Sequence, residues 1–262
     1  MDHPCGRRVL EAWEAGRSAR NAWLTIPDPY LAEIVAARGP VEAVTLDLQH
    51  GLFDRRSAVN ALRSIAVHGA APLVRMPDLD PALIGYLLDA GAAGLIAPMV
   101  ESASEVTDLV AACRYPPSGR RSYGPNRSGL AQGFNAFAAA EQALLFAMIE
   151  TRAGLEQAED IAAVEGVTGL FIGPGDLGLS LGIGPGQDRE EPEIQDALIR
   201  IRDACQQAGK RCAVHANGAR YAARIAGQGY DLVTVWVDVV AISSSLADAE
   251  RAWTAATRPT LD

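Results

Sequence analysis

Short apolar runs rich in β-branched residues recur along the chain, and longer segments with helical periodicity lie between them. The apolar runs predict eight strands, at residues 22–26, 43–48, 72–76, 94–100, 145–150, 169–173, 211–216 and 232–238. Helical patterns occupy residues 29–39, 56–69, 81–91, 154–166, 193–209 and 218–229, and several of them close on a glycine. This alternation predicts an α/β fold, a (β/α)8 TIM barrel, and a doubly wound parallel sheet is the alternative.

Composition and charge narrow the classes of partner. No linker divides residues 1–262, so we expect a single domain. The formal net charge of -9 argues against nucleic acid and anionic membranes, which both select clustered Lys and Arg. No apolar run is long enough to predict a membrane span, and the N-terminus does not predict a secretion signal. The four cysteines are not spaced as metal ligands are: Cys5, Cys113, Cys205 and Cys212. We therefore expect a cytoplasmic protein with reduced thiols.

Polar residues recur where the predicted strands end. Asp47 and His50 leave the second strand, Arg75 the third, Glu150 the fifth and Asp176 the sixth. The carboxyl ends of the strands of a parallel barrel open onto one face, where active sites of this fold lie. The sequence therefore predicts that these five side chains converge on one mouth.

Glu150 and Asp176 are candidate ligands of a metal ion. Carboxylate oxygens on neighbouring strand ends suit a hard divalent cation such as Mg²⁺ or Mn²⁺. The alternative is structural, with Asp176 as a helix N-cap and Glu150 bonded to nearby backbone. His50, three residues after Asp47, is a candidate acid or base that this carboxylate orients, whereas His215 is expected to be structural or peripheral.

The segment GPGDLG, residues 173–178, fits the G-x-G-x-x-G pattern of dinucleotide-binding turns. That pattern also needs a sustained helix after the glycines and an acidic residue about 20 positions further on. Neither follows Asp176, so the glycines are interpreted as a tight turn that brings the backbone close to whatever Asp176 binds.

The connection from Cys113 into residue 143 is unusually long for a barrel, and such loops are commonly functional. Its Arg120, Arg121 and Arg127 could clamp an anionic substrate, and Arg121 is our candidate for this role. A solvated or subunit-contacting loop is the alternative.

Six motifs in one order carry a resemblance that runs from about Trp23 to Asp238. They are LDLQHG, VRMPD, LLDAGAAGLIAPMVESASE, CRYPPSGRRSYGP, MIETRAG and GVTGLFIGPGDLGLSLG. With these motifs the chain resembles the HpcH/HpaI family of class II pyruvate-dependent aldolases, which cleave 4-hydroxy-2-oxo acids. The resemblance implies a barrel that assembles as a homo-oligomer, a hexamer, often with a C-terminal helix exchanged between subunits.

The resemblance also implies roles for individual residues. Glu150 and Asp176 would hold Mg²⁺, Mn²⁺ or Co²⁺, and Arg75 would face the carbonyl oxygen of pyruvate. His50 with Asp47 would act through water as acid and base. The remaining positions are implied to bind substrate: the turn of Gly173, Pro174 and Gly175 at the pyruvate carboxylate, and Asp89 at the aldehyde end of a neighbouring subunit's site.

Lysine content bears on the mechanism. An aldolase stabilises its enolate with a lysine Schiff base or with a metal. Lys210 is the only lysine and stands before the seventh strand, at the wrong end of the barrel. We therefore expect a metal-dependent aldolase that yields pyruvate and an aldehyde.

Three functional alternatives stay open. The first is a lyase acting on CoA thioesters of malyl or citramalyl type, which would need a basic groove. The others are a nicotinamide-binding oxidoreductase and a non-catalytic barrel. Gln49, Met148 and Gly178 depart from the residues usual in the family, Glu, Gln and Ser, and this places the acceptor specificity in question.

Overall fold

The computed structural model describes residues 6–131 and 142–257, and its strands form one closed parallel barrel. Neighbouring strands pair in sequence order, and β8 pairs with β1 to close the circle. The strands are β1 (Ala19–Leu24), β2 (Ala43–Asp47), β3 (Ala71–Arg75), β4 (Gly94–Ala97), β5 (Leu144–Ile149), β6 (Gly169–Ile172), β7 (Arg211–Val214) and β8 (Leu232–Val237). The predicted (β/α)8 fold is confirmed.

Two predicted strand boundaries differ by three residues from the structure, and the other differences are of one or two residues. β1 begins at Ala19 rather than at residue 22, because Ala19, Arg20 and Asn21 already pair with β8. β4 ends at Ala97 rather than at residue 100, because the backbone of Met99 turns into the left-handed region with φ 54°. A non-glycine residue there is uncommon and often marks a functional position.

The helices surround the barrel, and several of them begin at sequence-encoded caps. Asp28, Asp54 and Ser102 each accept a hydrogen bond from the backbone of the first helical turn that follows them. The predicted helix over residues 154–166 is interrupted at Gln157. The helices are α1 (Arg7–Glu14), α2 (Pro29–Arg38), α3 (Arg55–Val67), α4 (Pro81–Asp89), α5 (Ala103–Cys113), α6 (Asn126–Ala131), α8 (Arg152–Glu156), α9 (Ala158–Ala162), α10 (Pro174–Ser180), α11 (Pro192–Gln207), α12 (Ala219–Ala226) and α13 (Asp238–Thr257).

The inside of the barrel is packed with side chains and has one open end. Leu73, Ile96, Phe146 and Phe171 belong to one buried cluster within the ring of strands. The helix α1 contributes Val9, Ala12 and Trp13 to the same cluster, and Trp13 Nε1 donates to the carbonyl of Asp231 at 2.7 Å. Helix α1 therefore covers the amino end, and the carboxyl end of the strands, called the mouth below, is left for chemistry.

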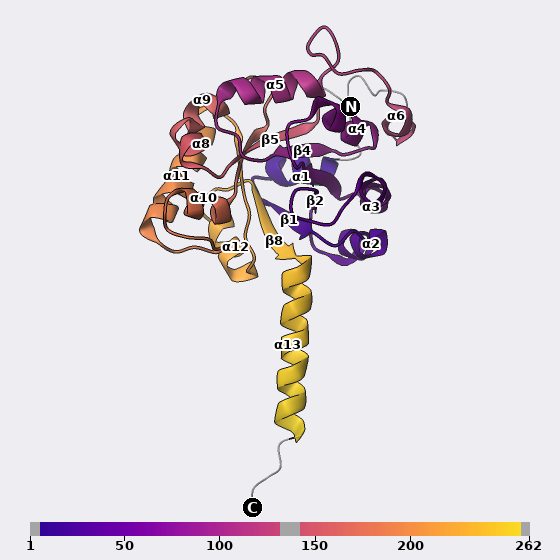
Figure 1. Cartoon of the computed structure of the whole chain (residues 1–262). Coiled ribbons are helices and arrows are strands. Elements are labelled where there is room, and N and C mark those ends of the chain that lie inside the picture. Colours follow the sequence, from indigo (N-terminus) through magenta and orange to yellow (C-terminus); the bar gives the residue numbers. More distant parts are fainter. Residues whose placement is uncertain (1–5, 132–141, 258–262) are drawn as a thin grey trace, which may run out of the picture.

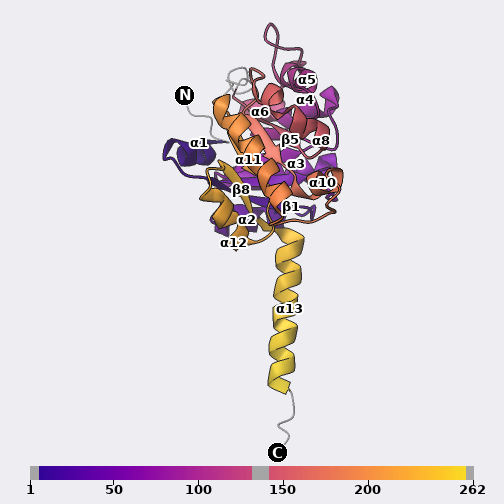
Figure 2. The same cartoon turned by 90° about the vertical axis from the view of Figure 1, so that its left-hand side faces the viewer.

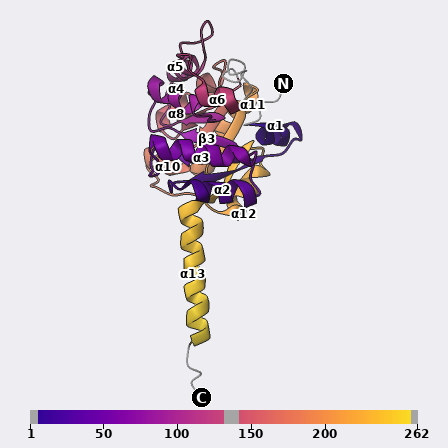
Figure 3. The same cartoon turned by 90° about the vertical axis from the view of Figure 1, so that its right-hand side faces the viewer.

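Helix α13 leaves the barrel and extends away from it, as Figures 1, 2 and 3 show from three sides. Asp238 fixes its start, because the carboxylate accepts hydrogen bonds from the backbone of Thr25 at 2.7 Å and of Ile26 at 2.8 Å. Asp238 is also the only buried residue of this helix. Within the described part of the chain, no helix combines the length and apolar character needed to cross a membrane.

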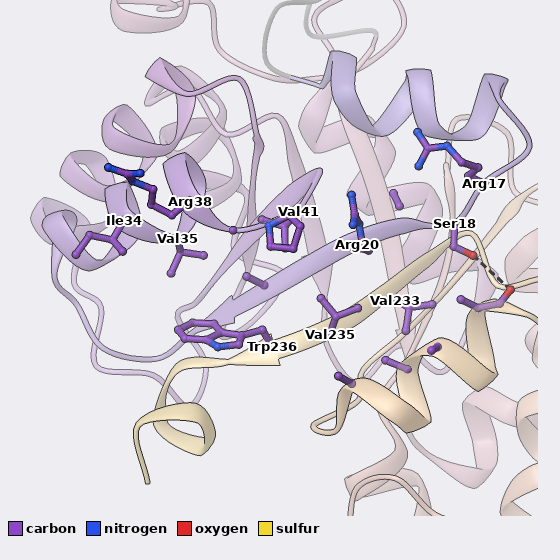
Figure 4. A pocket seen from close by; sticks show the side chains of 18 of the residues that line it. Arg17, Ser18, Arg20, Ile34, Val35, Arg38, Val41, Val233, Val235 and Trp236 are labelled. Atoms are coloured by element: carbon purple, nitrogen blue, oxygen red, sulfur yellow. Dashed lines mark hydrogen bonds between the residues drawn. The ribbon is translucent and has the colours of Figure 1, made fainter. Parts of the chain in front are cut away.

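The direction of α13 leaves a groove on the outside of the barrel. In a (β/α)8 barrel the helix after the eighth strand normally completes the outer ring between its neighbours. Here an open cavity of about 920 Å³ lies between α2 and α12, over β1 and β8. Val35, Val41, Val233, Val235 and Trp236 line it, as Figure 4 shows.

Candidate active site at the mouth of the barrel

The mouth contains a pocket of about 270 Å³. All five strand-end residues named from the sequence line this pocket: Asp47, His50, Arg75, Glu150 and Asp176. The structure therefore brings together residues that are up to 129 positions apart along the chain, from 47 to 176, and the predicted convergence is confirmed.

Asp47 and Arg75 form a buried ion pair across the β2–β3 ladder, in which they are register partners. Arg75 Nε donates to Asp47 Oδ1 at 2.9 Å, and Nη2 donates to Oδ2. Trp23 Nε1 also donates to Oδ2 at 3.3 Å, and its ring lies 5.0 Å from the guanidinium carbon. Burial alone would raise the pKa of Asp47, but the bonds and charge of Arg75 hold it below its usual value.

His50 lies at the exposed rim of the pocket. Its contact with Asp47 runs through the backbone: Oδ1 accepts from the N–H of Gln49 at 3.0 Å and of His50 at 3.2 Å. The side chain that Asp47 orients is that of Arg75, whereas the sequence predicted that it orients the imidazole. The guanidinium of Arg75 contacts both carboxylate oxygens of Asp47. The turn after β2 contacts the same carboxylate through its backbone N–H groups and not through the imidazole.

Glu150 is a buried carboxylate with one satisfied oxygen. Oε1 accepts from the backbone N–H of Met99 at 2.8 Å, and Met99 makes this contact with its backbone in the left-handed region. Oε2 is buried without a hydrogen-bond partner among the described residues. A Cβ on Gly173 would lie 2.5 Å from it, so glycine is required beside this oxygen. Burial raises the pKa of Glu150 to about 7, and the nearby charge of Asp176 adds to the shift.

Asp176 lies in the first turn of α10, and the residue preceding this helix, Gly173, provides no side-chain cap. The structural alternative therefore fails for Asp176, which is not an N-cap, and holds for one oxygen of Glu150. Helix α8 is capped by Thr151 instead. An unpartnered buried oxygen beside a second carboxylate fits a hard divalent cation, which binds oxygen and keeps some positions for water or substrate.

The described residues contain no group of three or more His, Cys, Asp or Glu side chains placed to hold a metal. A cation at Glu150 and Asp176 would thus receive two protein ligands. This number is usual for Mg²⁺, which is commonly held by one or two carboxylates with substrate oxygens and water.

The three departures from the family pattern have different surroundings. Gly178 is required by packing, because a Cβ there would lie 2.6 Å from the carbonyl oxygen of Gly184. Met148 is buried in the pocket wall against Gly173. Gln49 has a buried Oε1 without a hydrogen-bond partner among the described residues.

Asp89 and Arg121 lie away from their own mouth. Arg121 donates to Asp89 Oδ1 and packs over the ring of Tyr115 at 4.8 Å, in a second cavity of about 370 Å³. The expectation that Arg121 clamps a substrate at this mouth is not met, because a helix-to-strand connection lies at the amino ends of the strands. In Figure 1 it runs at the top, whereas α13 leaves from the lower side. Residues 132–141 of the predicted loop lie outside the described residues.

The remaining loop arginines and the single lysine are also bound elsewhere. Arg120 pairs with Asp108 at 2.9 Å, and Arg127 donates to the carbonyl of Ala90. Lys210 Nζ donates to the carbonyl of Val167 at 2.9 Å, immediately before β6 and β7 begin. This lysine lies at the end of the barrel opposite the mouth, as predicted.

Several pocket residues were not identified from the sequence as part of the site. Trp23 supports Arg75, and His215 packs edge-on against Trp23 at 4.8 Å with a buried Nδ1. Gln187 and Asn217 enter the pocket from the connections after β6 and β7. The available signal was position, because His215 and Asn217 stand at or just after the end of a predicted strand.

Comparisons with known proteins agree with this geometry. The model of the HpcH/HpaI aldolase/citrate lyase family matches residues 21–244. A hydroxypyruvate/pyruvate aldolase of Rhizorhabdus wittichii is 39% identical over 247 residues, which are 92% of this chain and 98% of the relative. A Pseudomonas aeruginosa protein of the same name is 37% identical over 95% of this chain and 92% of its own length.

Solved structures give the same result. An HpcH/HpaI aldolase/citrate lyase family protein from Burkholderia cenocepacia superposes with a TM-score of 0.84 at 30% identity, over 91% of this chain and 95% of that protein. The citrate synthase SbnG superposes with a TM-score of 0.81 at 28% identity, over 93% and 98% of the two chains.

The surroundings of His215 predict that this residue makes stability sensitive to acid. Burial, with the charge of Arg75, lowers the pKa of His215 to about 4, whereas an unfolded histidine titrates near 6.5. At this residue the unfolded state therefore binds more protons as the pH falls from about 6.5 to 4, and His215 should contribute a loss of stability of up to about 1.4 kcal/mol per pH unit there.

Urea unfolding at pH 7 and pH 4.5 measures this dependence. The variant His215→Gln should lose less stability than the wild type between the two values, and His68→Gln, on a half-buried surface histidine, should behave as the wild type. Equal losses in wild type and His215→Gln would contradict the assignment.

Proposed function

The chain belongs to the HpcH/HpaI aldolase/citrate lyase family, and we propose that it is a divalent-metal-dependent aldolase. In this proposal it reversibly cleaves a 4-hydroxy-2-oxo acid to pyruvate and an aldehyde. The observation that carries the proposal is the buried, unpartnered Oε2 of Glu150 beside Asp176, at a mouth that also contains the Asp47–Arg75 pair. The names of the curated relatives, which are aldolases acting on pyruvate or hydroxypyruvate, support the choice of reaction.

Glu150 and Asp176 are the proposed metal ligands. Their oxygen donors suit Mg²⁺ and Mn²⁺, and Co²⁺ is the third candidate. When bound, the cation would supply Lewis-acid stabilisation of the enolate charge that develops as the C–C bond breaks. The charge balance supports this assignment, because Asp47 already neutralises Arg75 and leaves both metal-site carboxylates without a paired cation.

Arg75 is proposed to stabilise the oxygen of the reacting carbonyl. Asp47 occupies Nε and Nη2, so Nη1 is the guanidinium nitrogen left for this oxygen, and a fixed donor lowers the barrier most when it needs no reorganisation. His50 is proposed to take the proton of the 4-hydroxyl through water, and its exposed rim position allows this exchange.

The turn of Gly173, Pro174 and Gly175 is proposed to seat the pyruvate carboxylate. Helix α10 begins here, and no side chain caps the N–H groups of its first turn. Gly173 and Gly175 both line the mouth pocket, so the backbone is accessible to a bound anion.

The CoA-thioester alternative has less support from the site. A CoA nucleotide needs cationic groups near the mouth, but Arg120 and Arg121 are paired with Asp108 and Asp89 at the other end of the barrel. A nicotinamide site is also disfavoured, because residues 174–178 of GPGDLG already belong to α10, which has only 7 residues and is not a sustained helix.

A homo-oligomer with exchanged α13 helices is also proposed, and the family resemblance makes a hexamer the expected size. The exposed apolar residues of this helix recur at helical spacing on one face: Val239, Ile242, Leu246 and Trp253. The groove between α2 and α12 is lined mainly by apolar residues, and no helix of the described chain covers it. The α13 of a second copy is the proposed occupant, and Asp89 would reach a neighbouring mouth in the same assembly.

The metal assignment predicts the behaviour of Glu150→Gln. Pyruvate should exchange its C3 protons in D2O, followed by NMR, only with added Mg²⁺, Mn²⁺ or Co²⁺. Glu150→Gln removes the charge that binds the cation at nearly constant volume, so exchange should fall on the order of 100-fold or more, with the melting temperature retained.

The surface variant Glu165→Gln is the matched control and should exchange as the wild type does. Near-normal exchange in Glu150→Gln would contradict the metal assignment. No exchange by the wild type with any of the three metals would contradict the aldolase proposal, and malyl and citramalyl CoA would be tested next.

The exchanged helix predicts a charge-sensitive assembly. Leu246→Asp places a carboxylate within the apolar stripe and should reduce the mass measured by light scattering after size exclusion, whereas Ser244→Asp adds the same charge on the opposite face and should not. A monomeric wild type, or equal masses for both variants and the wild type, would contradict helix exchange.

A further inference from the structure

Gln187 lies in the mouth pocket, on the connection between α10 and α11. Its side chain is exposed, and its amide forms no hydrogen bond to the described residues. A free amide directed into a pocket offers two N–H donors and one oxygen acceptor to a ligand.

The residue after Gln187 anchors this connection to the end of β7. Asp188 Oδ1 accepts from the backbone N–H of Asn217 at 2.9 Å, and Oδ2 accepts from that of Gly218 at 2.7 Å. The backbone of Asp188 is in the left-handed region with φ 55°, a conformation that persists only where the surroundings impose it.

Arg189, the next residue, also anchors this connection. Its Nη1 donates to the carbonyl of Gly184 at 2.7 Å, and its own carbonyl accepts from Gln195 Nε2 at 2.6 Å and from the hydroxyl of Tyr221 at 3.1 Å. Because hydrogen bonds fix both residues that follow Gln187, the backbone presents Gln187 to the pocket in one position. Little ordering of this backbone is required on binding.

The amide nitrogen of Gln187 lies over the glycine turn. A Cβ on Gly175 would be 2.8 Å from Gln187 Nε2, so the absence of a side chain at Gly175 makes the space that this nitrogen occupies. The Gln187 donor is therefore adjacent to the Gly173–Gly175 turn, the proposed seat of the pyruvate carboxylate.

The other side-chain donors of the pocket are mostly occupied. Arg75 and Trp23 donate to Asp47, and Thr25 Oγ1 donates to Asp238 at 2.9 Å. His50 follows β2, which is opposite β6 in the closed order of eight strands, whereas the Gly173–Gly175 turn follows β6. Gln187 is thus an uncommitted side-chain donor on the side of the turn.

We propose that Gln187 is a substrate-binding residue whose amide donates a hydrogen bond to the carboxylate of the 2-oxo acid. The inference rests on the proposed aldolase function. A neutral donor suits this position, because with a divalent cation at Glu150 and Asp176 the charges of these carboxylates are balanced, and Asp47 balances Arg75.

Steady-state pyruvate proton exchange with saturating Mn²⁺ tests the proposal. Gln187→Ala should raise the KM for pyruvate about tenfold, the usual effect of losing a hydrogen bond to a charged group, with kcat within about twofold. Gln187→Glu should raise it further, because its carboxylate repels that of the substrate. Inhibition by oxamate, an isostere of pyruvate, should weaken in parallel.

Three controls separate binding from structural disturbance. The dissociation constant for Mn²⁺, measured by electron paramagnetic resonance, and the KM for the probe aldehyde glycolaldehyde should both stay within about twofold in Gln187→Ala. Gln207→Ala, on the exposed face of α11, should match the wild type in every assay.

An unchanged pyruvate KM in both Gln187 variants overturns the proposal. A change confined to the KM for glycolaldehyde, or a parallel loss of Mn²⁺ affinity, also overturns it, since the residue would then act on the acceptor or on the fold of the mouth. A wild type that exchanges no protons with metal refutes the aldolase function, and the inference falls with it. Exchange by the wild type with normal Gln187 variants refutes the inference alone.

Discussion

The buried ion pair of Asp47 and Arg75 determines the electrostatics of the mouth. Two buried charges are stable only when they are paired and hydrogen-bonded, and here the guanidinium, the indole of Trp23 and two backbone N–H groups satisfy the carboxylate. The pair therefore contributes no net charge to the pocket. Glu150 and Asp176 remain uncompensated, and this deficit is the physical reason for proposing a divalent cation in a pocket where, among the described residues, Arg75 is the only lining arginine or lysine.

Close backbone approach is the second constraint on this site. Glu150 Oε2 fits because Gly173 has no Cβ, Gln187 fits because Gly175 has none, and Gly178 accommodates the returning carbonyl of Gly184. The glycines of GPGDLG thus resemble those of a phosphate-binding turn for a shared reason, since both bring backbone close to other groups. What distinguishes them here is that two of the three glycines make room for side chains of this protein.

The periodicity of the sequence was sufficient for the barrel, because strands buried on both sides read as apolar runs whatever their neighbours are. The convergence of Asp47, Arg75, Glu150 and Asp176 followed from topology alone, since parallel strands end on one face. Arg121 could not be placed in this way, because it was chosen as a possible anion clamp from the length of its connection, and this connection runs at the amino ends. Gln187 was equally hidden, since its position depends on hydrogen bonds that Asp188 forms with Asn217 and Arg189 forms with Gly184. No regular sequence pattern predicts these bonds.

The start of α13 connects the mouth to the assembly. Val237, Val239 and Val240 line the pocket, while Asp238 between them is bonded to the backbone after β1. The same residue therefore sets the apolar wall of the pocket and the direction in which the helix leaves the barrel. If α13 of each copy fills the groove over β1 and β8 of another, a displacement of the helix acts on its own barrel through Asp238. This residue lies within one residue of the pocket wall. Assembly and substrate binding would then share one anchor, and the helix could not be redirected without altering the mouth.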